Sequence, residues 1–197
     1  SSATKRGGSW VSFPEDFSHN DLLDLKEYEG VIYCGHLFEH FGHFVTESLA
    51  RLWFAKVNPG LDLLFTAQRQ FLSPYQASIL EALGYSSDRV KIVQKPALIK
   101  NSFVPNSSFE LHNFISPKYL DSFDFVLNSR DFEAAKERAL TKQCSDLLYV
   151  SRLKVNPRRE FGEVLIEQHV REAGSDIIYP EEHSFVDQLA TYSCYNK

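Results

Sequence analysis

The chain alternates short apolar runs with longer stretches of helical periodicity, and this order constrains its fold more than any other feature. The apolar runs are rich in β-branched and aromatic residues, which is typical of buried strands. They cover Val31–Cys34, Leu61–Phe65, Val90–Val93, Ala97–Val104, Leu147–Ser151 and Ile177–Tyr179. Strands that alternate with helices of ten or more residues form βαβ units. The sequence therefore predicts an α/β fold with a parallel sheet.

Local signals mark several helix ends. Ser73 is a typical N-cap, Pro74 suits the first helical position, and Gln76 completes a capping box. Gly84 then ends this helix as a C′ glycine. Further helices are expected over about 40–56, over 116–142 with a break near 128–129, over 160–173, and from 184 toward the C-terminus. We expect residues 1–30 to form an irregular lead-in.

Composition and charge narrow the classes of function. The 197 residues hold 21 Lys and Arg against 26 Asp and Glu, a net charge of −5, so nothing points to a nucleic-acid partner. The three cysteines are widely spaced, which argues against a zinc ribbon and against a disulfide framework. No apolar run reaches the roughly 18 residues of a transmembrane helix, and no signal-peptide core is evident. We therefore expect a soluble, cytoplasmic protein.

The stretch from Cys34 to Trp53 carries the densest chemical signal. On a continuous helix, His43, Glu47 and Arg51 would lie at i, i+4 and i+8 and form one polar stripe, which His40 joins at its N-terminal end. The apolar residues of the stretch fall on the opposite face, as ordinary core. Because the stripe follows a predicted strand, it lies where α/β proteins bind ligands.

Three interpretations of this stripe stay open. It can be a partly exposed ion cluster that only supports the helix. It can be a metal site formed by His40, His43 and Glu47, although HxxHxxxE lacks the spacing of established zinc motifs. It can also be an acid–base or substrate-binding site, because a Glu four residues after a His can orient the imidazole or act as a base itself.

A second candidate site is the basic loop after the apolar run Leu147–Ser151. Four cations fall within eight residues, just before a predicted helix: Arg152, Lys154, Arg158 and Arg159. Loops at the carboxyl ends of parallel strands, followed by a helix N-terminus, favour anionic ligands. The loop therefore predicts a phosphate-binding site, with a solvated basic loop as the alternative.

Four segments, taken together, resemble one known family. The segment HFGHFVTESLARLW is similar to the signature segment of glycosyltransferase family 61, which includes bacterial capsular polysaccharide biosynthesis proteins. Three further segments agree with that family in order and spacing: SPYQASILEALGY, LLYVSRLKVNPRREFGE and GSDIIYPEEHSFVDQLATYS. The resemblance spans about residues 30–193.

The resemblance implies a GT-B enzyme, in which two Rossmann-like domains transfer a sugar with inversion. The first domain would cover residues 31–145, and residues 146–197 would form the beginning of the second. On matching positions, His43 and Glu47 would face the cleft between the domains, and one of them would act on the acceptor hydroxyl. The residues expected to bind substrate are His40, Arg51, Arg152, Arg158 and Arg159, among which Arg152 and Arg159 would hold the donor diphosphate.

The family also sets expectations about partners. The substrates would be a nucleotide sugar and a glycan acceptor, in polysaccharide synthesis and without a metal cofactor. Peripheral membrane association and a homodimer are further candidates. Gly162 stands where the family commonly has Asn, and the family's later segments would follow Lys197, so we expect the second domain to be incomplete. A catalytically inactive scaffold is the alternative function.

Overall fold

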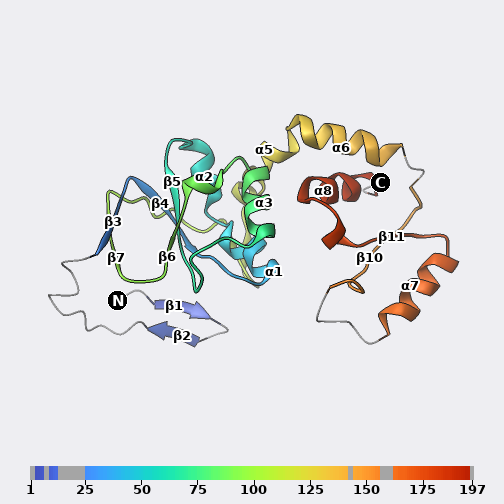
Figure 1. Cartoon of the computed structure of the whole chain (residues 1–197), viewed down its shortest axis with the longest axis horizontal. Helices are drawn as coiled ribbons and strands as arrows, with labels where there is room; N and C mark the ends of the chain where they lie inside the picture. The colour runs from blue at the N-terminus through green and yellow to red at the C-terminus, as the bar shows by residue number, and fades with distance from the viewer. Residues whose placement is uncertain (1–2, 7–8, 13–24, 142–143, 156–161, 196–197) are drawn as a thin grey trace.

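The computed structural model describes residues 3–6, 9–12, 25–141, 144–155 and 162–195, and its elements are shown in Figure 1. At its centre is a parallel sheet with the strand order β4-β5-β6. These strands span Val31–His36, Asp62–Thr66 and Val90–Val93, and α2 (Leu52–Val57) and α3 (Pro74–Ala82) lie between them in the chain. The predicted α/β pattern with parallel strands is therefore confirmed for this part of the chain.

The sheet is continued by a second parallel pairing. Strand β3 (Lys26–Glu29) pairs with β7 (Ala97–Lys100), and the chain then turns at Gly30 into β4. Phe103 continues the pairing, because Tyr33 donates to its carbonyl and its own N–H donates to Val31. The predicted strand 97–104 is thus a four-residue strand followed by a single bridge.

Two expectations about local structure are wrong. The first thirty residues are not wholly irregular, since they contain β3 and an antiparallel hairpin of β1 (Ala3–Arg6) and β2 (Ser9–Ser12). The expected helix over 40–56 is interrupted. It consists of α1 (Phe41–His43), the π-helical turn η2 (Phe44–Ser48), a turn, and then α2.

The main core lies between the central sheet and its helices. Its fully buried side chains come from β4, η2, the turn after η2, α2, β5 and α3, and they include Ile32, Cys34, Phe44, Leu49, Leu52, Leu63, Phe65 and Leu80. The Cys34 thiol donates to the Ile32 carbonyl at 3.5 Å. Burial raises the pKa of Cys34 to about 12, so this thiol is neutral in the folded protein.

The chain continues through three helices to a second unit. The helices are α4 (Pro117–Asp121), α5 (Asp124–Leu127) and α6 (Arg130–Leu140), after the short η3 (Ser87–Arg89) and a small hairpin, β8 (Phe109–Glu110) and β9 (Phe114–Ile115). The second unit holds β10 (Leu148–Val150), α7 (Glu163–Glu172), β11 (Asp176–Ile178), η4 (Pro180–Glu182) and α8 (Phe185–Cys194). Its two strands pair in parallel, as expected for a βαβ unit.

Helix α8 joins the two units. It packs against α6, where Phe132, Ala135 and Ala190 form a small buried cluster, and it also contacts α3. Figure 1 shows α8 between α6 and the β10–β11 pair. Among the described residues, no helix has the length and apolar character that crossing a membrane requires.

Candidate active site

The loop after β4 is held by a buried serine from η2. Ser48 is only 1% exposed, and its hydroxyl donates to the His36 carbonyl at 2.8 Å while it accepts from the Phe38 N–H at 2.9 Å. Leu37 donates to Thr66 at the end of β5, at 2.7 Å. The chain therefore leaves the sheet in a fixed direction, toward His40 and α1.

The burial of three side chains in one segment accounts for the π-helical turn. Phe44, Ser48 and Leu49 are all buried, and the Leu49 N–H donates to the Phe44 carbonyl, five residues back, at 3.3 Å. A regular α-helix would rotate these three side chains further apart around its axis. Single π turns inside helices occur frequently at functional sites.

This turn brings His43 and Glu47 together at the surface. Nδ1 of His43 contacts Oε1 of Glu47, and the two side chains are 47% and 30% exposed. Because an ionised carboxylate can only accept, Nδ1 must carry the proton in this pair. In the neutral imidazole, Nε2 is then left as an acceptor, which is the form that a general base requires.

Two rings lie next to the imidazole of His43. The ring centroid of His43 is 5.5 Å from that of His40 and 5.5 Å from that of Phe38. His40 thus lies beside His43, as the sequence predicts. Among the described residues, however, no group of three His, Cys, Asp or Glu side chains is arranged to hold a metal ion. His40, His43 and Glu47 are therefore not assembled as a ligand set.

Arg51 does not continue the predicted stripe, and this expectation is wrong. The turn between η2 and α2 breaks the i, i+4, i+8 register. Nε of Arg51 donates to the Pro105 carbonyl at 3.0 Å, and Nη1 donates to the Cys34 carbonyl at 3.4 Å. Gly35, with a φ of +93°, makes room for the guanidinium, because a Cβ there would lie 2.8 Å from Nη1. These contacts fix the edge of β4.

The predicted basic loop is described only in part. Arg152 is exposed and follows β10 after one buried residue, Ser151. Lys154 pairs with Glu182 at 2.6 Å and lies over the Tyr179 ring, 4.0 Å from its centroid. Arg158 and Arg159 lie outside the described residues.

Two buried carboxylates that the sequence analysis missed organise the start of this loop. Oε1 of Glu163 accepts from the Arg152 N–H at 2.9 Å, from Tyr149 at 3.0 Å and from Ser151 at 3.4 Å. The Arg152 N–H is the main reason that the pKa of Glu163 lies below its ordinary value. Glu167, one turn later, also accepts from Ser151. The i, i+4 spacing of these two glutamates, directly after a basic loop, is the sequence pattern from which they could have been predicted.

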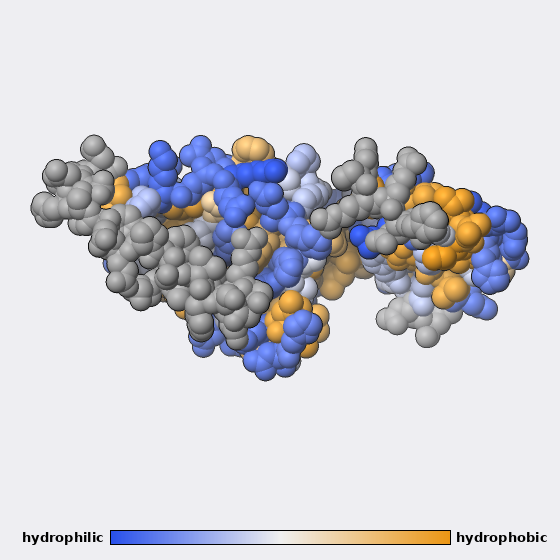
Figure 2. Space-filling model, turned by 90° about the horizontal axis from the view of Figure 1, so that it is seen from below, coloured by the Kyte–Doolittle hydropathy of each residue, from blue (hydrophilic) through white to orange (hydrophobic). Residues whose placement is uncertain are grey.

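The two candidate sites belong to different units. In Figure 1, α1 and the end of β10 lie on sides of their units that face one another. Figure 2 shows the same two units from below. Each site follows the carboxyl end of a parallel strand, which is where α/β proteins bind their ligands.

Comparison with known families shows which family the chain belongs to. A family profile described as Glycosyltransferase 61 matches residues 41–196. The chain belongs to glycosyltransferase family 61. The match begins at the first residue of α1 and extends through α8, so it includes the His43–Glu47 pair and the loop after β10. The resemblance inferred from the four sequence segments is thereby confirmed.

Membership of this family identifies the chain as a glycosyltransferase, whose substrates are a sugar donor and an acceptor. Neither the curated proteins nor the solved structures contained a match.

Proposed function

We propose that this family 61 glycosyltransferase moves a sugar from a nucleotide sugar to a hydroxyl group of a glycan acceptor, with inversion at the anomeric carbon. The observation that carries the proposal is the His43–Glu47 pair, which lies at the carboxyl end of β4 inside the family match. The setting we propose is glycan or capsular polysaccharide synthesis in the cytoplasm, where peripheral contact with a membrane would bring the enzyme to its acceptor.

In the proposed reaction, Nε2 of His43 accepts the proton of the acceptor hydroxyl. The oxygen then forms a bond to the anomeric carbon of the donor, while the bond from that carbon to the diphosphate oxygen breaks. The electron pair of the broken bond leaves with the nucleoside diphosphate. A single displacement of this kind inverts the anomeric configuration. Glu47 stabilises the imidazolium that forms, through its contact with Nδ1.

The departing diphosphate gains negative charge, and a cation near it lowers the barrier. We assign this role to Arg152, whose backbone Glu163 holds in place, together with Arg158 and Arg159. The 197 residues contain no Asp-x-Asp motif, so we propose that these arginines supply the positive charge instead of a metal held in that way. The β10–β11 unit would then be the start of a second, GT-B-type nucleotide-binding domain.

The test is a transfer assay with a panel of nucleotide sugars and glycan acceptors. For His43→Ala we expect kcat/KM to fall by about 10²- to 10⁴-fold, the usual contribution of a general base. The Glu47→Gln variant should lose less, since the imidazole stays in place. NMR of the product should show an inverted anomeric centre.

His169→Gln is the matched control, because His169 is exposed on α7 and away from the pair. It should keep full activity. Unchanged turnover in His43→Ala would refute the proposed base. If no donor is consumed although the chain is folded and binds nucleoside diphosphate, the alternative of an inactive scaffold is favoured.

A further inference from the structure

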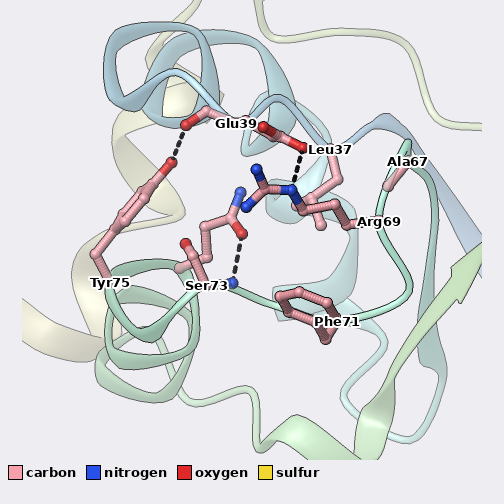
Figure 3. Close-up of a pocket in the computed structure, with 8 residues that line it drawn as sticks. Leu37, Glu39, Ala67, Arg69, Phe71, Ser73 and Tyr75 are labelled. Atoms are coloured by element: carbon pink, nitrogen blue, oxygen red, sulfur yellow. Dashed lines mark hydrogen bonds and ion pairs between the residues drawn. The ribbon is translucent and has the colours of Figure 1, made fainter.

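A small cavity is lined in part by the loop that follows β4, the same loop that leads into α1 and the His43–Glu47 pair. Its volume is about 110 Å³. Figure 3 shows that three segments form its wall: the residues after β4, the residues after β5, and the start of α3. The lining residues are Leu37, Glu39, Ala67, Arg69, Phe71, Ser73, Tyr75 and Gln76. The cavity thus opens at the carboxyl ends of two neighbouring parallel strands.

The charged groups of the cavity form a neutral pair. Nε of Arg69 lies 2.8 Å from Oε1 of Glu39, and both side chains are about half exposed, at 58% and 48%. The carboxylate cancels the guanidinium charge, so the cavity is unsuited to a diphosphate. A carboxylate that accepts beside a guanidinium that donates suits neighbouring hydroxyl groups instead, because each hydroxyl both donates and accepts.

An aromatic ring lies beside this ion pair. Phe71 is 64% exposed although it is large and apolar, and Figure 3 shows its ring at the cavity. Aromatic faces bind apolar C–H surfaces, and an amphipathic ligand with a polar edge and an apolar face can use both features at once. A sugar ring has this combination.

The wall of the cavity is preformed. The Tyr75 hydroxyl donates to the Glu39 carbonyl at 2.6 Å, and the Gln76 amide donates to the Phe38 carbonyl at 2.9 Å. The Ser73 N–H in turn donates to Oε1 of Gln76 at 2.8 Å. Ordering these groups for a ligand therefore costs little conformational entropy.

From these observations we infer that the Glu39–Arg69–Phe71 cavity binds a neutral sugar ring of a substrate. This inference rests on the proposed function, and it names a binding position for the sugar next to the base. Glu39 comes four residues before His43 in the chain, and the ring centroids of His40 and His43, the residues that follow it, are 5.5 Å apart. The sugar is either the acceptor residue that carries the reacting hydroxyl or the sugar of the donor.

Binding is tested first without any reaction. Methyl glycosides of common hexoses and N-acetylhexosamines are titrated into the isotopically labelled full chain, and NMR shifts are followed. We expect at least one glycoside to shift residues of the cavity, with an affinity about tenfold weaker in Arg69→Ala and about threefold to tenfold weaker in Phe71→Ala.

Arg138→Ala is the matched control, because Arg138 also forms a single exposed ion pair, with Asp187 at 2.9 Å. It should bind the glycoside as the wild type does, and equal thermal unfolding midpoints for all variants should exclude misfolding. Equal weakening in Arg138→Ala, or glycosides that shift no residue of the cavity, would overturn the inference.

Two measurements then distinguish whether the bound sugar belongs to the acceptor or to the donor. If the acceptor occupies the cavity, Arg69→Ala raises the acceptor KM about tenfold and leaves nucleotide-sugar binding unchanged. If the donor sugar occupies it, Arg69→Ala weakens binding of the nucleotide sugar but not of the bare nucleoside diphosphate. Either pattern supports the cavity, and normal values of all three constants in Arg69→Ala would contradict it. Failure of the proposed base appears separately, as undiminished turnover in His43→Ala.

Discussion

At the scale of single residues, the most consequential side chain outside the His43–Glu47 pair is Glu163. It is 5% exposed, and one of its oxygens accepts from the backbone of Arg152 and from two hydroxyl groups. A buried carboxylate is tolerated only when hydrogen bonds replace its hydration. Glu163 therefore sets the path of the chain at the point where the loop expected to bind the donor begins.

This arrangement predicts a pH-dependent effect of Glu163→Gln. Because the folded-state pKa of Glu163 is lowered, its carboxylate stabilises the fold above the unfolded pKa of about 4.3, and this contribution is lost as the pH falls through the lower folded value. We expect Glu163→Gln to unfold at lower urea concentration than the wild type at pH 7. The difference between the two urea midpoints should be smaller at pH 3.

Glu172→Gln, at an exposed position of the same helix, is the control and should match the wild type at both pH values. A gap for Glu163→Gln that is as large at pH 3 as at pH 7 would show that the carboxylate charge is not involved.

At the scale of elements, the sequence predicts strands and helix ends well wherever a local signal exists. Ser73 and Gln76 make the expected contact before α3, and the break at 128–129 lies between α5 and α6. The signals fail where tertiary contacts decide. The break after η2 depends on the Ala50 carbonyl, which accepts from the N–H of Ser108 far along the chain at 2.8 Å.

The same reason separates His43 and Glu47 from Arg51 in the candidate site. An i, i+4 pair needs only one turn, and it forms across the start of the π-helical turn. An i, i+8 relation needs two regular turns, and the break removes it. Nor does the residue pattern reveal the Glu39–Arg69 pair, since its members come from loops after different strands.

The role of η2 is testable through Ser48→Ala. Loss of the hydroxyl leaves the His36 carbonyl and the Phe38 N–H without their partner in a buried place, so we expect a loss of stability of about 1–3 kcal/mol. Urea denaturation measures it.

Thr46→Ala, in the same turn, removes only an exposed hydrogen bond to the Gly42 carbonyl and should change stability by less than about 0.5 kcal/mol. If both variants lose the same amount, the serine has no special part in holding the loop.

At the scale of the whole molecule, α8 belongs to both cores. Phe185, Val186 and Leu189 pack against the core of the central sheet, and Val186 and Leu189 also pack against the cluster on α6. The boundary expected at residue 145 lies between α6 and α8 in the chain, yet these two helices pack on each other. Sequence order alone does not reveal this, because helix pairing across a domain boundary is a long-range contact.

The shared helix predicts that the chain unfolds in one cooperative transition. Leu189→Ala should lower stability by about 1–2 kcal/mol, less than for a fully buried leucine, and should shift the single transition as a whole. Calorimetry with Leu165→Ala as control tests this, because Leu165 is 71% exposed. Two separate transitions in the wild type would contradict the prediction.

The burial of Cys34 has a practical consequence. Its thiol is fully buried in β4, and burial raises its pKa to about 12, so at neutral pH alkylating reagents find almost no thiolate while β4 is in place. The rate at which Cys34 is alkylated therefore reports how often β4 opens, and no introduced probe is needed to follow that event.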